Sequence, residues 1–277
     1  MVVQVIFYLA LLCSFAIWFI LIILPCKPYK YNESFEVDEK EQINSQNLPK
    51  ISILIPARNE EKILPLTLPS ILSQDYPDFE LILIDDHSTD QTKAVAEEIA
   101  KNTQMGKNTM TVIEGKPLEE GWAGKLWALN QGVMNAKGDW FLLTDADISY
   151  SPNLIKSLVN HAISDKREMV SLMAKLKTDI FWEKVLIPAF LYFFKILYPF
   201  KYVNDNKKKV AAAAGGCILI KKEFLEKIGG ISTIKNALIY DVSLAKEVKK
   251  NDGSIKLMVC PTLLSQRGYE NLSGIWN

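Results

Sequence analysis

The longest apolar run lies at the amino terminus, where Val5 to Leu24 form about twenty residues without a charged side chain. A helix of this length spans the hydrocarbon core of a bilayer. The run lacks the basic amino-terminal region and small-residue cleavage site of a removed signal peptide. Lys27 and Lys30 follow it and no Lys or Arg precedes it, so the positive-inside bias leaves the amino terminus outside. We therefore expect residues 1–27 to be a single-pass membrane anchor, with the rest of the chain in the cytoplasm.

Residues 28–50 are mostly polar and acidic and end near Pro49, which is typical of a linker. Beyond them, short apolar runs alternate with helical patterns. We expect strands over residues 51–56, 80–84, 109–113 and 140–144, and helices over 92–101 and 125–136. A further helix should end near Ser73, shortened or bent by Pro65 and Pro69. This alternation predicts an α/β domain over residues 51–277, with a mostly parallel sheet and crossover helices.

Polar loops rich in acidic residues follow three of the expected strands, at residues 57–61, 85–90 and 145–147. The carboxyl ends of parallel strands lie along one edge of a sheet, so these loops should border one crevice. In extended backbone, Asp145 and Asp147 would point to the same side and suit one Mg²⁺ ion. Taken alone, the pair is more typical of a polar turn or of the cap of a helix starting near Pro152 than of a metal site. The three loops together favour a binding site, and Asp90 should cap the helix over 92–101.

Composition narrows the class of protein. The 277 residues are 49% hydrophobic and carry a formal net charge of zero, which gives no support to a nucleic-acid partner. The four cysteines are scattered without C-x-x-C spacing, so neither a disulfide framework nor a zinc site is expected. The two histidines, His87 and His161, are too far apart for a histidine metal site. The four scattered cysteines are explained more simply by a reduced compartment, in which they stay as free thiols.

Several short motifs carry a family resemblance. Residues 55–60 (IPARNE), 84–92 (IDDHSTDQT), 124–125 (GK) and 144–147 (TDAD) resemble family 2 glycosyltransferases of GT-A fold, which is Rossmann-like. Residues 121–128 (GWAGKLWA), 186–190, 197–200 and 211–217 are similar to the hopanoid-associated branch of that family. The motifs are short, but their order and spacing are specific. The likeness runs from about Ile51 to the end of the chain.

The resemblance implies a site for a nucleotide-diphosphate sugar, with a uracil nucleotide expected. The residues expected to hold it are Pro56, Ala57, Arg58, Asn59, Glu60, Asp85, Asp86, Lys125 and Asp145. Asp86 would accept a uracil ring N–H, because a carboxylate only accepts hydrogen bonds. Asp147, with Asp145 beside it, would ligate Mg²⁺ or Mn²⁺ bridging the diphosphate. Lys125 would add a positive charge near the phosphates, although it also fits a solvated residue at a helix start.

The resemblance also implies a general base, Asp241, which would take a proton from the acceptor hydroxyl as it attacks the anomeric carbon. One displacement inverts the configuration at that carbon. Relatives usually carry two acids here, and this chain has Tyr240 in place of the first. A solvated aspartate at a helix start is the alternative interpretation of Asp241.

Residues 181–200 are apolar and aromatic but contain three charges and two prolines, a poor composition for a spanning helix. An interfacial helix with its apolar face in lipid fits better, and a buried core helix is the alternative. Lys207, Lys208 and Lys209 would contact anionic headgroups. With an interfacial helix, the acceptor should be a lipid or polyisoprenoid presented from the membrane.

We therefore expect a membrane-anchored, inverting glycosyltransferase that moves a sugar from a nucleotide-diphosphate sugar to a lipid. The sequence ends at Asn277, whereas the resemblance implies that relatives continue through an acceptor-side segment and further membrane helices. We therefore expect either a shortened form of the family or a fragment of a longer chain. A shortened, inactive protein that only binds nucleotide sugars is one alternative. A nucleotidyltransferase is the other, since that class also uses carboxylates at strand ends with Mg²⁺.

Overall fold

The computed structural model describes residues 2–23, 33–37, 48–104, 106–269 and 271–276. Its first helix, α1 (Val2–Ile23), carries no charged side chain along its whole length and has no buried residue. Within the described ranges it alone is long and apolar enough to cross a membrane. The lysines on which the predicted orientation depends, Lys27 and Lys30, lie outside these ranges.

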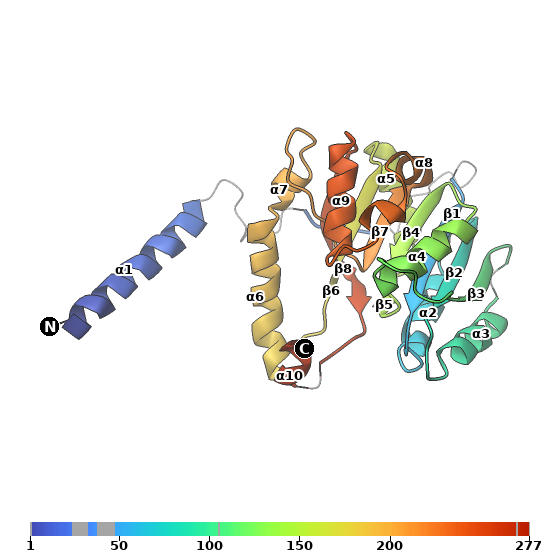
Figure 1. The fold of residues 1–277 in the computed structure, drawn as a ribbon, viewed down its shortest axis with the longest axis horizontal. Coiled ribbons are helices and arrows are strands. Elements are labelled where there is room, and N and C mark those ends of the chain that lie inside the picture. The colour runs from blue at the N-terminus through green and yellow to red at the C-terminus, as the bar shows by residue number, and fades with distance from the viewer. Residues whose placement is uncertain (1, 24–32, 38–47, 105, 270, 277) are drawn as a thin grey trace.

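One eight-stranded sheet forms the centre of the domain, in the order β3-β2-β1-β4-β7-β6-β8-β5 (Figure 1). Its first four strands are mutually parallel, as the sequence predicts. They are β1 (Ile51–Ala57), β2 (Phe79–Asp85), β3 (Thr109–Glu114) and β4 (Trp140–Thr144). Each lies within one residue of its predicted bounds, because each is an apolar run bounded by polar or turn residues.

The second half of the sheet is mixed. Strand β7 (Cys217–Lys221) runs antiparallel to both β4 and β6 (Met169–Lys175). Strand β6 then pairs in parallel with β8 (Ile255–Ser265), whose end pairs antiparallel with the short β5 (Ile148–Ser149). The sheet is therefore a mixed α/β sheet with two parallel parts joined through one antiparallel strand.

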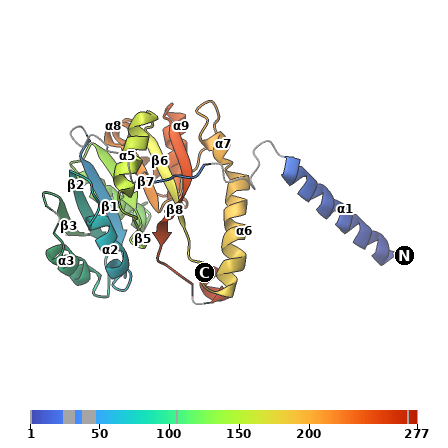
Figure 2. The ribbon, with the colours of Figure 1, turned by 180° about the vertical axis from the view of Figure 1, so that it is seen from behind.

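Helices cover both faces of the sheet, as the two opposite views show (Figures 1 and 2). One face carries α2 (Leu64–Leu72), α3 (Thr92–Asn102) and α5 (Leu154–Ser164). The other carries α4 (Gly124–Asn135), α8 (Lys222–Lys227) and α9 (Tyr240–Lys250). Each face has its own apolar core, and alternation along β1 divides the strand between them: Ile53 joins one core and Leu54 the other.

Helix α6 (Phe181–Leu197) stands beside the sheet rather than on either face, followed by α7 (Phe200–Val203) (Figures 1 and 2). In an ordinary surface helix the apolar side chains face the protein and the charged ones face solvent, but several side chains of α6 do the opposite. Glu183 and Lys195 are buried at 1% and 5% exposure, whereas Phe193 and Leu197 are 62% and 69% exposed. The described domain leaves this apolar outer face uncovered. The carboxy-terminal α10 (Leu272–Trp276) lies near the start of α6.

Part of the segment expected to be a linker packs against the domain. Phe35 is 5% exposed, and its N–H donates to the carbonyl of Val259 on β8 at 2.7 Å. Val259 in turn donates to the carbonyl of Glu33 at 2.9 Å. Residues 33–37 therefore belong to the packed structure of the domain, although they precede the first predicted strand.

Candidate active site

A cavity of about 430 Å³ lies where the parallel strands β1, β2 and β4 end. Charged side chains of both signs line it. Eight predicted site residues line it: Pro56, Ala57, Arg58, Glu60, Asp86, Lys125, Asp145 and Asp147. Ala146 and Arg267 complete the lining. The convergence of loops expected from a parallel sheet is therefore present.

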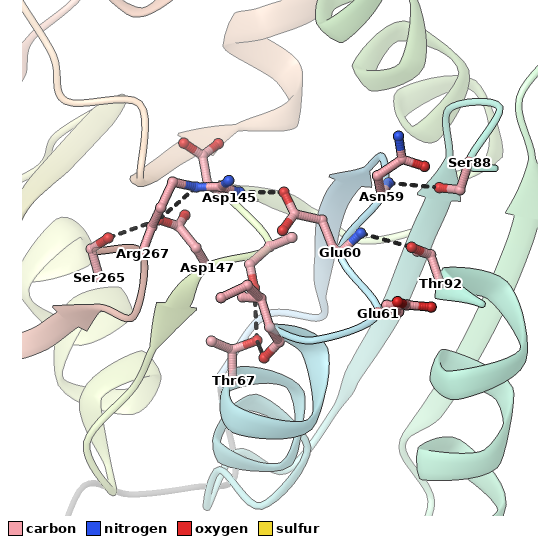
Figure 3. Close-up of polar contacts among 12 residues, drawn as sticks. Asn59, Glu60, Glu61, Thr67, Ser88, Thr92, Asp145, Asp147, Ser265 and Arg267 are labelled. Carbon is pink, nitrogen blue, oxygen red and sulfur yellow. Dashed lines mark hydrogen bonds and ion pairs between the residues drawn. The ribbon is translucent and has the colours of Figure 1, made fainter. Parts of the chain in front are cut away.

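Asn59 holds two loops together and does not line this cavity. Its φ of 57° lies in the left-handed region, which asparagine tolerates better than most residues. Its side-chain oxygen accepts the N–H of Thr89 at 2.8 Å, and its own N–H donates to the Ser88 hydroxyl at 3.0 Å. The predicted binding residue thus fixes the position of the second loop relative to the first (Figure 3).

Asp85 is also outside the cavity lining. It is 7% exposed and its carboxylate faces the Ser88 N–H at 3.3 Å. Its neighbour Asp86 lines the cavity. The Asp86 N–H donates to the carbonyl of Ala57 at 2.8 Å, and this bond extends the pairing of β1 and β2 beyond the two strand ends. The lack of a side chain at Gly124 leaves room beside the Asp86 carboxylate, which would lie 3.4 Å from a Cβ there.

Asp90 ties the same two loops from the other side. Its carboxylate accepts the N–H of Thr92 at 3.0 Å and that of Glu61 at 3.2 Å. Helix α3 begins at Thr92, and the residue at its cap position is Gln91, not Asp90 as the sequence predicts. Asp90 therefore stabilises the helix start from one residue further out, while joining the β1 and β2 loops.

Asp145 and Asp147 reach the cavity through a turn. The N–H of Ile148 donates to the carbonyl of Asp145 at 3.3 Å, so the backbone is not extended as the side-chain alternation assumed. Asp145 pairs with Lys125, with 2.5 Å between Nζ and Oδ1. Burial raises the pKa of Asp145, and the Lys125 ammonium counters part of that rise. Both carboxylates still line one cavity, each beside its own cation.

Arg267 is the residue of this site that the sequence did not suggest. It follows β8, its guanidinium bonds the Glu60 carboxylate, and its Nε lies 3.7 Å from Oδ2 of Asp147 (Figure 3). Ser265 donates to the same Asp147 oxygen at 2.7 Å. Burial raises the pKa of Glu60, whereas Arg267 works against that rise. The available signal was the mostly apolar stretch of residues 255–264, which leads into Ser-Gln-Arg and so forms a further strand end with polar residues.

A second cavity of about 220 Å³ adjoins the first, because Asp145 and Asp147 line both. Asp241, in the first turn of α9, lines this second cavity. Burial raises the pKa of Asp241, and the N–H groups of Val242 and Gly215 oppose the rise. Phe190, Leu191 and Phe194 of α6 form part of its apolar wall, so the helix beside the sheet contributes to the site.

Tyr240 fixes the glycine turn of the second cavity. Its hydroxyl donates to the carbonyl of Gly215 at 2.8 Å. A Cβ at position 215 would lie 2.7 Å from that hydroxyl, so only glycine fits there. The Lys125 ammonium lies 4.7 Å from the centre of the Tyr240 ring. Tyr240, which replaces an expected acid, therefore positions backbone and lysine around Asp241.

Glu183 connects α6 to the segment that carries Arg267. One carboxylate oxygen accepts the N–H groups of Asp179 at 2.7 Å and Ile180 at 3.1 Å, and the other accepts that of Tyr269 at 2.7 Å. These bonds, that of Tyr269 above all, lower the pKa of Glu183. The carboxylate thus holds the start of α6 and the residues after β8 together.

Glu183→Gln should loosen this connection, because the amide group presents an N–H₂ donor where the carboxylate accepted backbone N–H groups. We expect faster hydrogen exchange at the amides of Tyr269, Ile180 and Asp179, measured by mass spectrometry on the intact protein. The exposed neighbour serves as the control, and Lys184→Gln should leave the same amides unchanged. Equal exchange in Glu183→Gln and wild type would contradict this role.

Two of the curated relatives are glycosyltransferases of bacteria. The chain is 30% identical over 191 residues to the "Probable glycosyltransferase YdaM" of Bacillus subtilis, covering 68% of this chain and 44% of that protein. It is 30% identical over 139 residues to the 4,4'-diaponeurosporenoate glycosyltransferase of Staphylococcus aureus, covering 50% of this chain and 35% of that protein. The chain therefore spans less than half the length of these relatives.

Solved structures share the fold at low sequence identity. The mannosyltransferase PcManGT of Pyrobaculum calidifontis, in complex with GDP-Man and Mn²⁺, matches with a TM-score of 0.57 and 19% identity, covering 82% of this chain and 59% of that chain. TarS 1–349 of S. aureus, in complex with UDP-GlcNAc, matches with a TM-score of 0.54 and 17% identity, covering 81% of this chain and 60% of that chain. These likenesses confirm the GT-A fold.

The family profile described as "Glycosyl transferase family 2" matches residues 52–229, more than half of the chain. The matched stretch contains the β1, β2 and β4 strand ends and the two glycines of the second cavity. It ends before Asp241 and Arg267, which the structure adds to the same pair of cavities. The chain belongs to glycosyl transferase family 2.

Proposed function

We propose that the protein is a membrane-anchored, metal-dependent glycosyltransferase. It would transfer the sugar of a nucleotide-diphosphate sugar, preferably a UDP-sugar, to a lipid and invert the configuration at the anomeric carbon. The observation that carries this proposal is the junction of two cavities at Asp145 and Asp147. One cavity has the strand-end loops that suit a nucleotide, and the other has a half-buried carboxylate, Asp241, beside apolar walls.

The donor half is the larger cavity. The loop of residues 56–60 and the Asp86 carboxylate would hold the nucleoside, with Asp86 accepting a base N–H. Lys125 and Arg267 would face the diphosphate, since both cations line this cavity. Asn59 and Asp85 would contribute indirectly, by fixing the loops through Ser88 and Thr89.

The two carboxylates fit a divalent ion that is shared with a substrate. Among the described residues, no three His, Cys, Asp or Glu side chains gather as a metal-binding group. Mg²⁺ needs only one or two carboxylates when phosphate oxygens and water complete its shell. Asp147, with Asp145 beside it, would hold Mg²⁺ or Mn²⁺, and the ion would neutralise charge on the departing diphosphate.

Asp241 would act as general base in the smaller cavity. Its carboxylate would accept the proton of the acceptor hydroxyl while that oxygen forms a bond to the anomeric carbon. The bond from the same carbon to the diphosphate oxygen breaks, and the nucleoside diphosphate leaves with the electron pair. Attack from the face opposite the leaving group inverts the configuration.

The reversed polarity of α6 supports a lipid acceptor. A helix that buries Glu183 and Lys195 while Phe181, Phe190 and Phe193 are exposed suits the membrane interface. Its inner residues line the cavity that holds Asp241, so the acceptor would arrive from the lipid side. The relative that acts on 4,4'-diaponeurosporenoate, and the resemblance of residues 121–128 to the hopanoid-associated branch, also support a polyisoprenoid or related lipid.

A cluster of lysines adds to the predicted membrane contact. Lys207, Lys208 and Lys209 border a hollow with Lys246 and Lys250 of α9. The partly buried Lys249 secures this arrangement, because its ammonium donates to the carbonyls of Tyr202, Asp205 and Lys208. Lys250 pairs with Glu247 at 3.2 Å, and the remaining lysines, Lys207, Lys208, Lys209 and Lys246, suit the headgroups of anionic lipids.

Replacing Phe193 and Leu197 together by glutamate should release the protein from liposomes once α1 is deleted, a deletion that removes no buried residue. Each substitution places a charge on the exposed apolar face of α6. We expect at least about a tenfold loss of binding in a flotation assay, equivalent to about 1.4 kcal/mol. Phe194 is unsuited to this test, because it packs against the core. Lys184→Glu provides the charge control, and unchanged flotation of the double variant would exclude α6 as the contact.

The reaction class is tested by its products. Membranes containing the protein, incubated with labelled nucleotide sugars, should release a nucleoside diphosphate and yield a labelled lipid identified by mass spectrometry. Release of pyrophosphate would instead indicate a nucleotidyltransferase. Nucleotide-sugar binding without transfer or hydrolysis would indicate a protein that only binds the donor.

A further inference from the structure

An apolar groove of about 470 Å³ lies between the inner side of α6 and strands β6 and β8. Its size falls within the range of small-molecule sites in proteins. Most of the surface of its wall is hydrocarbon, although four of the twelve lining residues are polar or charged. The apolar lining comes from Met173, Ala174, Leu176, Ile187, Pro188, Leu191, Val259 and Pro261. Protein cores normally fill such space with side chains, so an open groove of this size is a feature to explain.

A local irregularity in the sheet forms one wall of this groove. The pairing of β6 with β8 runs in register up to Ala174 and Cys260, then shifts so that Lys175 pairs with Leu264. Residues 261–263 are left out of the ladder, and Pro261, which has no N–H to offer a ladder, lies at the groove. Bulges of this kind redirect side chains and occur next to active sites.

The groove continues into the cavity that contains Asp241. Met173, Ala174, Leu176 and Leu191 line both. A molecule with a polar end beside Asp241 could therefore extend without leaving the protein into a region walled by hydrocarbon. Four polar residues also line the groove, Ser34, Lys175, Thr178 and Lys195, but they are few for a sugar chain, because each buried hydroxyl without a partner is costly.

We infer that this groove binds the hydrocarbon chain of the acceptor lipid and so places its hydroxyl end at Asp241. The inference rests on the proposed function and adds where the lipid lies. The chain passes beneath α6, against Ile187 and Leu191, while the outer residues of α6 contact the bilayer. The mostly apolar wall suits a flexible hydrocarbon or isoprenoid chain, and the proposed general base lies at the other end, in the cavity of Asp241.

Photo-crosslinking distinguishes the groove from the outer face of α6. The probe is farnesol with a diazirine at the end distant from its hydroxyl, added to the full chain in phosphatidylcholine nanodiscs. Labelled residues, identified by mass spectrometry, should be Ile187, Leu191 and Val259. Labels confined to Val185, Phe193 and Leu197 would show that the lipid stays in the bilayer and would overturn the inference. Equal groove labelling by a diazirine phosphatidylcholine would assign the groove to phospholipid instead.

A groove-filling substitution gives an independent measurement. Pro261→Trp should lower labelling of Ile187 and Leu191 at least about tenfold, because the indole occupies the groove from its wall. Leu197→Trp, on the outer face, should leave that labelling unchanged. Undiminished labelling of Pro261→Trp that binds UDP like wild type would contradict the groove as the site. UDP binding separates the proposed donor site from the proposed lipid groove. Absence of UDP binding in the wild type would count against the donor site, whereas groove labelling tests only the lipid site.

Discussion

Asp147→Asn is expected to lower metal-dependent turnover of the nucleotide sugar by about a thousandfold, because it removes the carboxylate that would hold the ion at the diphosphate. The donor-free fold should change little. The substitution breaks only the contacts of Asp147 with Ser265 and with Arg267, whose side chain is 51% exposed. Release of UDP from a UDP-sugar, measured over a range of Mn²⁺ concentrations, provides the readout.

Ser265→Ala is the matched control for Asp147→Asn. It removes the hydrogen bond to the Asp147 carboxylate but leaves the carboxylate in place, so the loss should be about tenfold to a hundredfold. Mn²⁺ binding, followed by its paramagnetic resonance signal in the presence of UDP, should weaken in both variants and more in Asp147→Asn. Full activity and full Mn²⁺ binding in Asp147→Asn would reject the metal site.

Asp241→Asn is expected to lower sugar transfer to lipid by about a hundredfold to ten-thousandfold while leaving UDP binding unchanged. The amide keeps the shape of the side chain and can no longer accept the hydroxyl proton. The residue lies in the smaller cavity and not in the lining of the donor cavity, which is why donor binding should persist. Transfer is measured as labelled lipid and binding by calorimetry.

Asp252→Asn tests whether any loss of a carboxylate on this part of the chain has the same effect. Asp252 lies beyond the far end of α9, in a left-handed conformation that asparagine also tolerates, and should have wild-type transfer. Transfer by Asp241→Asn at the wild-type rate would show that Asp241 is not the general base.

The parallel part of the fold and most of the donor cavity could be predicted from the sequence. Strands β1, β2 and β4 are apolar runs that end in polar residues, so local pattern is enough to define them. Parallel pairing then places Glu60, Asp86 and Asp145 at one edge without further information. The turn at Asp145–Asp147 could not be predicted in this way. The expectation that both side chains point to one side assumed that the backbone continues as an extended strand.

Arg267 could not be predicted, because its role depends on contacts between distant parts of the chain. It meets Glu60 from 207 positions away, and it does so only because β8 pairs with β6 and β5. The position of the antiparallel strand β7 between β4 and β6 likewise depends on pairing between segments that are distant in sequence. Local periodicity specifies which segments are strands but not which strands become neighbours.

Helix α6 shows a different limit. Its composition allowed either an interfacial or a buried helix, because the same aromatic residues suit both surroundings. In the structure one side of the helix faces the domain, where Glu183 accepts three backbone N–H groups, and Phe193 on another side is 62% exposed. That lipid covers the exposed side stays a prediction. A sequence pattern cannot tell which face of a helix has a partner.

The contact between Tyr240 and Gly215 constrains how this protein can diverge. A Cβ at position 215 would collide with the tyrosine hydroxyl, and loss of that hydroxyl would free the Gly215 carbonyl. A substitution at either position alone is therefore disfavoured, whereas a smaller residue at 240 would make side chains at 215 tolerable. Among its descendants, the two positions should change together or stay as they are, although 25 residues separate them.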